Sequence, residues 1–127
     1  MKLRIRDNSI RLRLTKSEVD DLKRHGLVTA KTGFPSGRDF SYQVESSPAS
    51  VKPEAFFSES VITVRVPETE VLAWASSNQV AMGGSLQLAD GQALDILVEK
   101  DFSCLAPREG EDESDMFPHP SVGSENC

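Results

Sequence analysis

Five basic side chains lie within the first thirteen residues, at a spacing that would gather them on one face of a β-ribbon. They are Lys2, Arg4, Arg6, Arg11 and Arg13, which we call the basic face. They alternate with leucine and isoleucine, which is the period of a strand whose successive side chains point to opposite sides. If Asn8-Ser9 is a two-residue turn, Arg6 lies across from Arg11 and Arg4 from Arg13. Like charges that face each other destabilise a sheet, so we expect the basic face to meet an anion.

The chain carries a matching run of carboxylates near its C-terminal end. Residues 109–115 read EGEDESD, and their carboxylates belong to Glu109, Glu111, Asp112, Glu113 and Asp115. One hypothesis is that this acidic tail docks on the basic face, because the planar fork of arginine can hold a carboxylate by two hydrogen bonds. Exposed ion pairs contribute only about 0–1 kcal/mol each, so docking would need an apolar anchor such as Phe117. The alternative is a solvated tail.

A second hypothesis makes the basic face a site for an external anion. The ligand would be a phosphate-bearing metabolite, a nucleic acid backbone or an acidic partner protein. The near absence of aromatic residues among the cations argues against nucleic acid, because bases are commonly bound by stacking on aromatic rings. The formal net charge of −6 points the same way. The sequence therefore favours a small anionic ligand or an acidic protein, and identifies no particular partner.

A third hypothesis is hydrolysis of phosphate esters in a charged barrel, with arginines holding phosphate and carboxylates holding a metal ion. Such a site needs acidic residues that alternate along one strand. The first strand instead reads K-x-R-x-R, while Asp95 and Glu99 stand apart on the last predicted strand. We therefore expect a non-enzymatic binding or interaction protein with no catalytic residue, and keep this hydrolase as the alternative.

No metal or other cofactor is expected. Cys104, His119 and Cys127 are the candidate soft ligands, and their spacing matches no zinc motif. Gly83-Gly84 lacks the lysine and hydroxyl residue that follow in a phosphate-binding loop, and no G-x-S-x-G elbow occurs.

An internal repeat indicates how these residues are positioned. With a shift of 52 positions, residues 10–29 align with residues 62–81, and five of the twenty aligned positions are identical. Each copy is predicted to run hairpin, helix, hairpin. The first copy spans about residues 2–46 and contains a capping box at Thr15–Glu18 and a helix-ending glycine at Gly26. The second spans about residues 55–102, with Trp74 on the buried face of its helix.

These elements predict an α+β fold of two ββαββ repeats, forming one antiparallel sheet or a small barrel with two short helices. Residues 46–54 would connect the repeats, and residues 105–127 would form an irregular acidic tail. A length of 127 residues and a mass of 13.9 kDa fit a single domain over 1–127. No apolar run is long enough to span a membrane. The N-terminal residues lack the apolar stretch of a secretion signal, so the predicted location is the cytoplasm.

Two segments carry a resemblance to a known family. They are KLRIRDNSIRLRLTKSEV at 2–19 and LVEKDFSCLAPREGEDESDMFPHP at 97–120, with the EKDFxCL core and the FPxP ending as the more specific parts. The chain resembles a family of small uncharacterised bacterial proteins, and the likeness covers nearly its whole length. The resemblance implies a bacterial, cytoplasmic protein with an ordered C-terminal segment, and supplies no catalytic residue. It also implies that a metal held by His119 is not a family property, because the family more often has Asn there.

Overall fold

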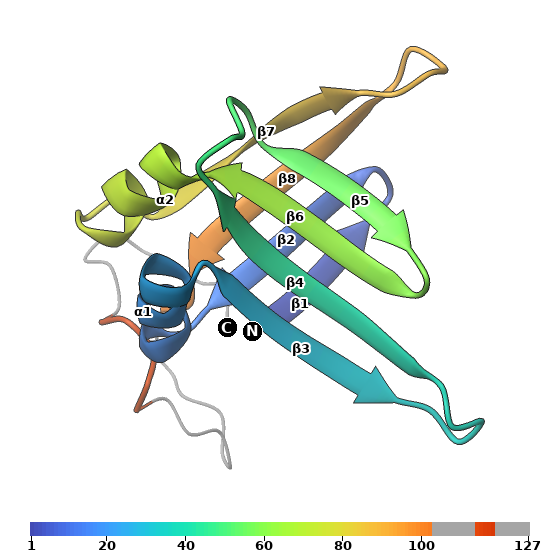
Figure 1. Ribbon diagram of the computed structural model, residues 1–127, viewed down its shortest axis with the longest axis horizontal. Coiled ribbons are helices and arrows are strands. Elements are labelled where there is room, and N and C mark those ends of the chain that lie inside the picture. Colours follow the sequence, from blue (N-terminus) through green and yellow to red (C-terminus); the bar gives the residue numbers. More distant parts are fainter. Residues whose placement is uncertain (103–113, 119–127) are drawn as a thin grey trace.

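Two hairpin–helix–hairpin halves make up the computed structural model, which describes residues 1–102 and 114–118 (Figure 1). The first half runs β1 (Lys2–Arg6), β2 (Ser9–Leu14), α1 (Lys16–His25), β3 (Leu27–Gly33) and β4 (Asp39–Ser47). The second half runs β5 (Glu54–Ser58), β6 (Val61–Pro67), α2 (Glu68–Ala75), β7 (Ala81–Gln87) and β8 (Ala93–Lys100). The two halves thus share one order of elements, while descent from a duplication stays a prediction from the sequence.

The strands form two four-stranded sheets. The first sheet has the order β1-β2-β8-β7 and the second has the order β3-β4-β6-β5. Each sheet therefore joins one hairpin from each half of the chain. Figure 1 shows the second sheet in front of the first, with both helices at the same end.

The α+β class is confirmed, but the expectation of one antiparallel sheet or a small barrel is wrong. Each sheet is mixed, because its two central strands, β2 and β8 or β4 and β6, pair in parallel. This pairing leaves β1 and β7 as the edge strands of the first sheet and β3 and β5 as those of the second. The sequence pattern sets the alternation of side chains within each strand and does not set which hairpins join.

Local signals fix the ends of α1. The Thr15 hydroxyl accepts a hydrogen bond from the backbone N–H of Glu18, while the Glu18 carboxylate accepts one from the backbone N–H of Thr15, which completes the predicted capping box. Gly26 ends the helix with φ of 77°, and its N–H donates to the carbonyl oxygen of Leu22 at 3.0 Å. These contacts define where α1 begins after β2 and where it ends before β3.

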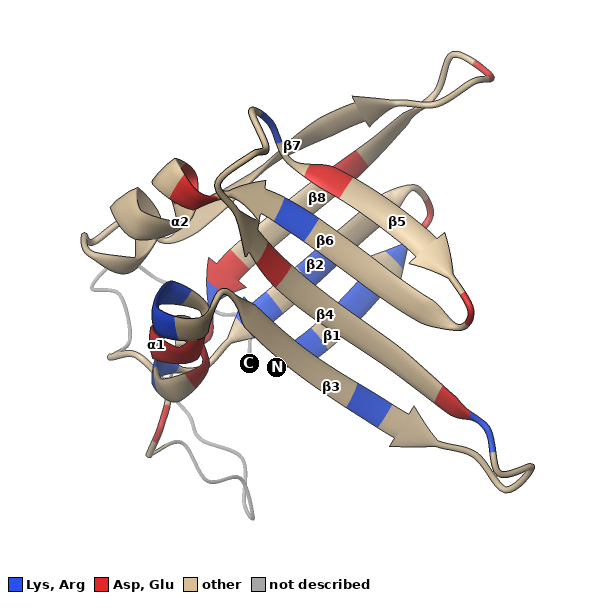
Figure 2. Ribbon diagram, in the orientation of Figure 1, with Lys and Arg blue, Asp and Glu red and all other residues tan. Residues whose placement is uncertain are grey.

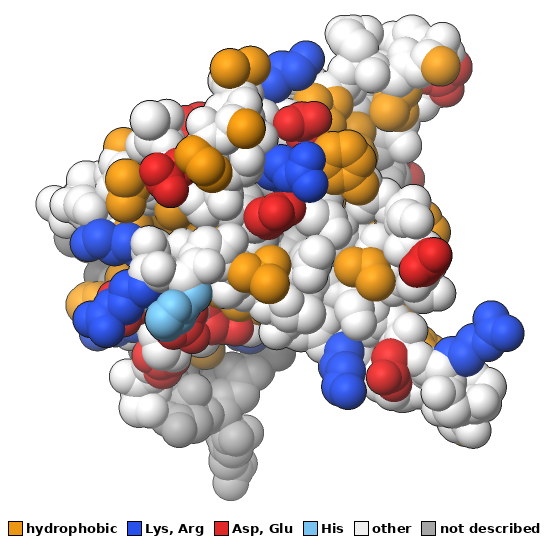
Figure 3. Space-filling view, in the orientation of Figure 1, with side chains coloured by type: hydrophobic (Ala, Val, Ile, Leu, Met, Phe, Trp, Pro, Cys, Tyr) orange, Lys and Arg blue, Asp and Glu red, His pale blue; other side chains and the backbone are white. Residues whose placement is uncertain are grey.

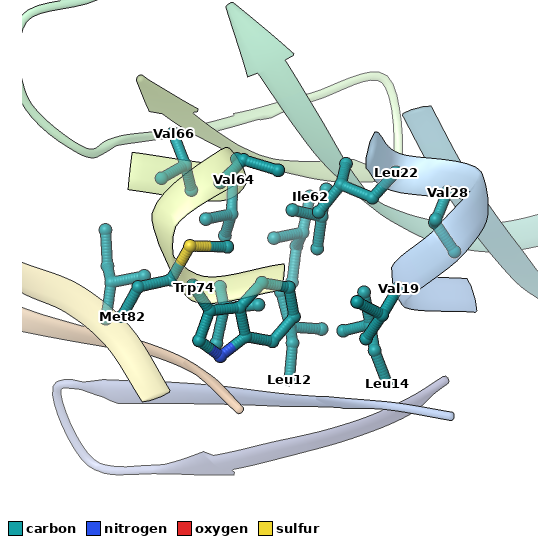
Figure 4. Close-up of a cluster of buried hydrophobic side chains, with 14 residues drawn as sticks. Leu12, Leu14, Val19, Leu22, Val28, Ile62, Val64, Val66, Trp74 and Met82 are labelled. Carbon is teal, nitrogen blue, oxygen red and sulfur yellow. The ribbon is translucent and has the colours of Figure 1, made fainter. Parts of the chain in front are cut away.

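The core fills the space between the sheets and helices (Figure 4). Trp74 is fully buried, as predicted, and its indole N–H donates to the carbonyl oxygen of Val80 at 2.9 Å. The other members of this buried hydrophobic cluster are Leu12, Leu14, Val19, Leu22, Val28, Val44, Ile62, Val64, Val66, Val71, Met82, Ile96 and Val98. Because the inner faces of both sheets are committed to this core, the basic residues that alternate with them face outward.

Candidate anion-binding site

The first hairpin turns one residue earlier than the sequence predicted. The loop is Asp7-Asn8, and Ser9 already pairs with Arg6 in the ladder. Arg4 lies across from Arg11, not from Arg13, and Lys2 lies across from Arg13. Asp7 adopts φ of 49°, a left-handed conformation that Asp tolerates better than most side chains. The register moves by two positions, which keeps every side chain on its predicted face because the period of a strand is two.

The basic face lies on the outer side of the first sheet, where β8 adds a third row of side chains. Figure 2 shows the Lys and Arg positions of β1 and β2 in blue and the acidic positions of β8 in red. The parallel register sets Ser9 beside Asp95, Arg11 beside Leu97 and Arg13 beside Glu99. Asp95 and Glu99 therefore share a surface with the arginines. The structure brings all five predicted cations onto this one surface. The outer side of the second sheet, seen in Figure 3, carries charges of both signs, for instance an Arg65–Glu45 pair at 3.0 Å.

Glu99 is the counter-ion for two of the arginines. Its Oε1 lies 2.6 Å from Nε of Arg13 and 3.5 Å from Nε of Arg11, and its side chain is only 14% exposed. Sequence reasoning treated Glu99 as isolated. The alternation of Asp95, Leu97 and Glu99 along β8 was the available signal, but it says nothing of the strand beside which these residues lie.

A second carboxylate meets the start of the basic face. Oδ2 of Asp101 lies 3.3 Å from Nζ of Lys2, and Asp101 is 4% exposed although the Lys2 side chain is largely in solvent. Asp101 follows β8 directly, and its backbone N–H donates to the carbonyl oxygen of Leu14 at 2.8 Å. The end of β8 therefore places this carboxylate beside β1 and β2. Sequence reasoning missed this residue too.

Arg4 and Arg6 differ from the other three cations. Within residues 1–102 and 114–118, no carboxylate lies within 4.0 Å of either guanidinium group. Both arginines are exposed and line a concavity of about 440 Å³ on the outer side of the first sheet. Its remaining lining residues are Ser9, Ile10, Arg11, Asp95, Ile96 and Leu97. Three cations and one carboxylate thus surround a hollow that opens to solvent.

The acidic tail enters the described structure only at its last carboxylate. Asp115 lies at the N-terminus of α1, where Oδ1 accepts from the backbone N–H of Ser17 at 3.1 Å and Oδ2 accepts from the Ser17 hydroxyl. Lys16 donates its backbone N–H to the Asp115 carbonyl oxygen at 2.9 Å. The hydrogen bond from Ser17, followed by one from Thr15, lowers the pKa of Asp115. Asp115 is therefore paired with a helix end and not with the basic face.

The other four tail carboxylates, Glu109, Glu111, Asp112 and Glu113, lie outside the described residues, so their docking on the basic face stays a prediction. Phe117 packs against the core, and its backbone N–H donates to the carbonyl oxygen of Asp101 at 2.9 Å. Its ring centroid lies 5.8 Å from that of Phe102. An apolar anchor for residues 114–118 therefore exists beside the end of β8.

Lys100 is a buried cation between this anchor and the core. Its Nζ donates to the carbonyl oxygen of Ser77 at 2.7 Å and lies 5.8 Å from the Trp74 ring centroid and 5.4 Å from that of Phe117. Burial lowers the pKa of Lys100. Its side chain is on the inner side of the first sheet, because it follows Ile96 and Val98 at the period of the strand. It is thus a structural contact and not a sixth member of the basic face.

Metal ligation by Cys104, His119 and Cys127 cannot be placed, because all three fall outside the described residues. Among the residues that are described, no group of three His, Cys, Asp or Glu side chains is arranged to hold a metal ion. Neither α1 nor α2 has the length and apolar character needed to cross a membrane, and these are the helices of the described part of the chain.

A family comparison covers nearly the whole chain. Residues 1–121 match the model of a family of unknown function, DUF7009. The chain belongs to this family. The match includes the basic face and the FPxP segment, in agreement with the resemblance seen in the sequence. Comparison with curated proteins and with solved structures gave no match. The family description assigns no activity.

Proposed function

We propose that this protein is a non-enzymatic binding protein that recognises an anionic group, and that the concavity at Arg4, Arg6 and Arg11 is its binding site. The proposal rests on one observation: three of the five cations have a carboxylate partner, and the other two have none among the described residues. Glu99 and Asp101 neutralise Arg11, Arg13 and Lys2, whereas no carboxylate of the described residues pairs with Arg4 or Arg6. Keeping like charges adjacent in a sheet costs stability, and an anion in the hollow would remove that cost.

The chemistry of the hollow fits carboxylate or phosphate groups. Guanidinium groups offer planar, paired N–H donors that match both kinds of oxygen. The Ser9 hydroxyl is beside them but donates to the carbonyl oxygen of Arg6 at 2.8 Å, so the arginines would supply most of the recognition. Asp95 on the rim would repel an anion that extended toward β7, which favours a ligand lying along β1. A cytoplasmic location is part of the proposal, because two cysteines do not make the disulfide framework common in small secreted domains.

Calorimetric titration with tripolyphosphate, at low and at high salt, tests the site. Hydrogen bonds to charged groups contribute about 1.5–3 kcal/mol each, so Arg4→Gln with Arg6→Gln should weaken binding by at least about tenfold. Arg38→Gln with Lys52→Gln is the matched control, because it removes the same charge from exposed positions outside the basic face. Equal losses in the two double variants would show that only net charge matters, and would refute the site.

The acidic tail is tested by the same titration. Replacing Glu109, Glu111, Asp112 and Glu113 by their amides should tighten tripolyphosphate binding if these carboxylates occupy the basic face. At high salt, where interactions between exposed charges are screened, this variant and the parent should bind tripolyphosphate with the same affinity. Unchanged affinity at low salt would refute docking of the tail and leave the site to an external anion.

A further inference from the structure

Along one side, the backbone of β1 pairs with no other strand of the described residues. β1 is the outermost strand of the first sheet, and β2 is its partner on the other side. In an antiparallel pair, alternate residues turn their N–H and C=O groups away from the partner strand. Within the described parts of the chain, no backbone hydrogen bond reaches residues 2–6 from that outer side. β1 is thus able to accept a further strand.

The two faces of β1 differ in chemistry. Lys2, Arg4 and Arg6 project from the outer face, while Leu3 and Ile5 project from the inner face. Ile5 is 54% exposed although it faces inward, and it lines an apolar cavity of about 470 Å³ between the two sheets. The other lining residues of this cavity are Ile10, Phe40, Ala55, Phe56, Phe57, Ile62 and Leu94. The outer face of β1 is therefore basic and its inner face is apolar.

We infer that β1 binds an extended peptide segment of a partner protein, in which acidic and apolar residues alternate. The inference rests on the proposed function, since the acidic side chains are the anions that the basic face receives. The peptide backbone pairs with the free edge of β1. Its acidic side chains then lie beside Lys2, Arg4 and Arg6, and its apolar side chains lie beside Leu3 and Ile5. Strand pairing sets both contacts at once, because peptide and β1 share the period of two.

The positive charge of β1 determines which kind of strand can pair with its free edge. Pairing of two copies through β1 would bring their Lys and Arg side chains together across the new ladder, and cations on an edge strand oppose such self-association. The carboxylates of an acidic peptide would instead be attracted to these Lys and Arg side chains. The other three edges lack this match, because β3 has one cation, Lys31, and neither β5 nor β7 has any.

The test uses fluorescent synthetic peptides and anisotropy at low salt. The probe alternates glutamate and valine, and the control has the same composition in the repeat Glu-Glu-Val-Val, which cannot place all its carboxylates on one face. We expect the alternating peptide to bind at least about tenfold more tightly. Equal binding of the two peptides, while tripolyphosphate still depends on Arg4 and Arg6, would overturn the inference and leave the proposed function standing. If the parent protein does not bind tripolyphosphate at all, the proposed function itself is overturned.

Variants of the protein separate the two faces of β1. Ile5→Thr keeps a β-branched side chain but removes apolar contact, so it should weaken peptide binding about fivefold and leave tripolyphosphate binding unchanged. Arg4→Gln with Arg6→Gln should weaken both. Val51→Thr is the control for Ile5, because Val51 is 93% exposed and lies outside both cavities. An Ile5→Thr variant that binds the peptide as the parent does would overturn the contact on the inner face.

Backbone pairing has its own readout. Two further peptides carry N-methyl groups, one on every glutamate and the other on every valine. Because alternate peptide N–H groups point to β1, one of the two should lose binding by at least about tenfold. Amide hydrogen exchange of residues 2–6 should slow with the parent peptide. Retention of binding by both methylated peptides would overturn strand addition.

Discussion

Substitution of Glu99 by glutamine gives the sharpest test of the electrostatics of the basic face. Glu99 accepts a hydrogen bond from Arg13 at 2.6 Å and lies 3.5 Å from Arg11. The glutamine has nearly the same shape, so the packing of β2 against β8 is kept. The change removes the negative charge and leaves two arginines side by side. It should therefore lower the stability of the protein without disturbing its core.

The magnitude follows from how far these side chains are buried. Exposed ion pairs contribute about 0–1 kcal/mol, but the Glu99 and Arg13 side chains are only 14% and 20% exposed. Hydrogen bonds to charged groups contribute about 1.5–3 kcal/mol, and the remaining exposure places this pair at the lower end. We expect the free energy of unfolding to fall by about 1.5–2 kcal/mol, which for a chain of this length lowers Tm by about 5–8 °C.

The assay is thermal and urea unfolding of the parent, Glu99→Gln and the control Glu45→Gln. Glu45 pairs with Arg65 at 3.0 Å across the parallel strands of the second sheet, but both side chains are 36% exposed. The control should lose at most about 1 kcal/mol. The Glu99 variant should also bind tripolyphosphate more tightly, since the basic face gains one unit of positive charge. Equal destabilisation of the two variants would refute the argument from burial.

Two further changes test contacts at the ends of α1. Asp115→Asn should remove a pH-dependent part of the stability. Because hydrogen bonds from Ser17 and Thr15 lower the pKa of Asp115, its contribution is complete above the unfolded value of about 3.9 and is lost as pH falls through the lower folded value. The gap in Tm between parent and variant should thus close in acid, and a constant gap would contradict this role. Gly26→Ala should lower the free energy of unfolding, measured in urea, by about 1–2 kcal/mol, because φ is 77° there. Gly37→Ala is the control, because its φ of 86° imposes the same backbone strain in an exposed loop, away from a helix end.

Much of the secondary structure could be predicted because its causes are local. The alternation in residues 2–14, the capping box at Thr15 and the glycine at position 26 act within a few residues of one another. The fully buried Trp74 was predicted from its place in the repeat. The turn lies one residue before its predicted position. Asp7-Asn8 and Asn8-Ser9 both contain residues suited to turns, and only the pairing of Arg6 with Ser9 distinguishes the two.

The neutralisation of the basic face could not be predicted in the same way. Glu99 is 86 positions from Arg13 in the sequence. Such contacts depend on which hairpins share a sheet. Both a parallel and an antiparallel arrangement would satisfy the same alternation of apolar residues, so the pattern alone does not choose between them.

The amino-acid sequence by itself determined that the five cations share one side of a ribbon and that the apolar residues between them face a core. Side-chain period requires both, whatever the ribbon pairs with. Only the tertiary structure decided which cations have no carboxylate partner among residues 1–102 and 114–118. The parallel pairing of β2 with β8 sets Glu99 against Arg11 and Arg13, and leaves Arg4 and Arg6 on an edge strand. The physical reason is that Coulomb interactions depend on distance in space, which sequence separation does not measure.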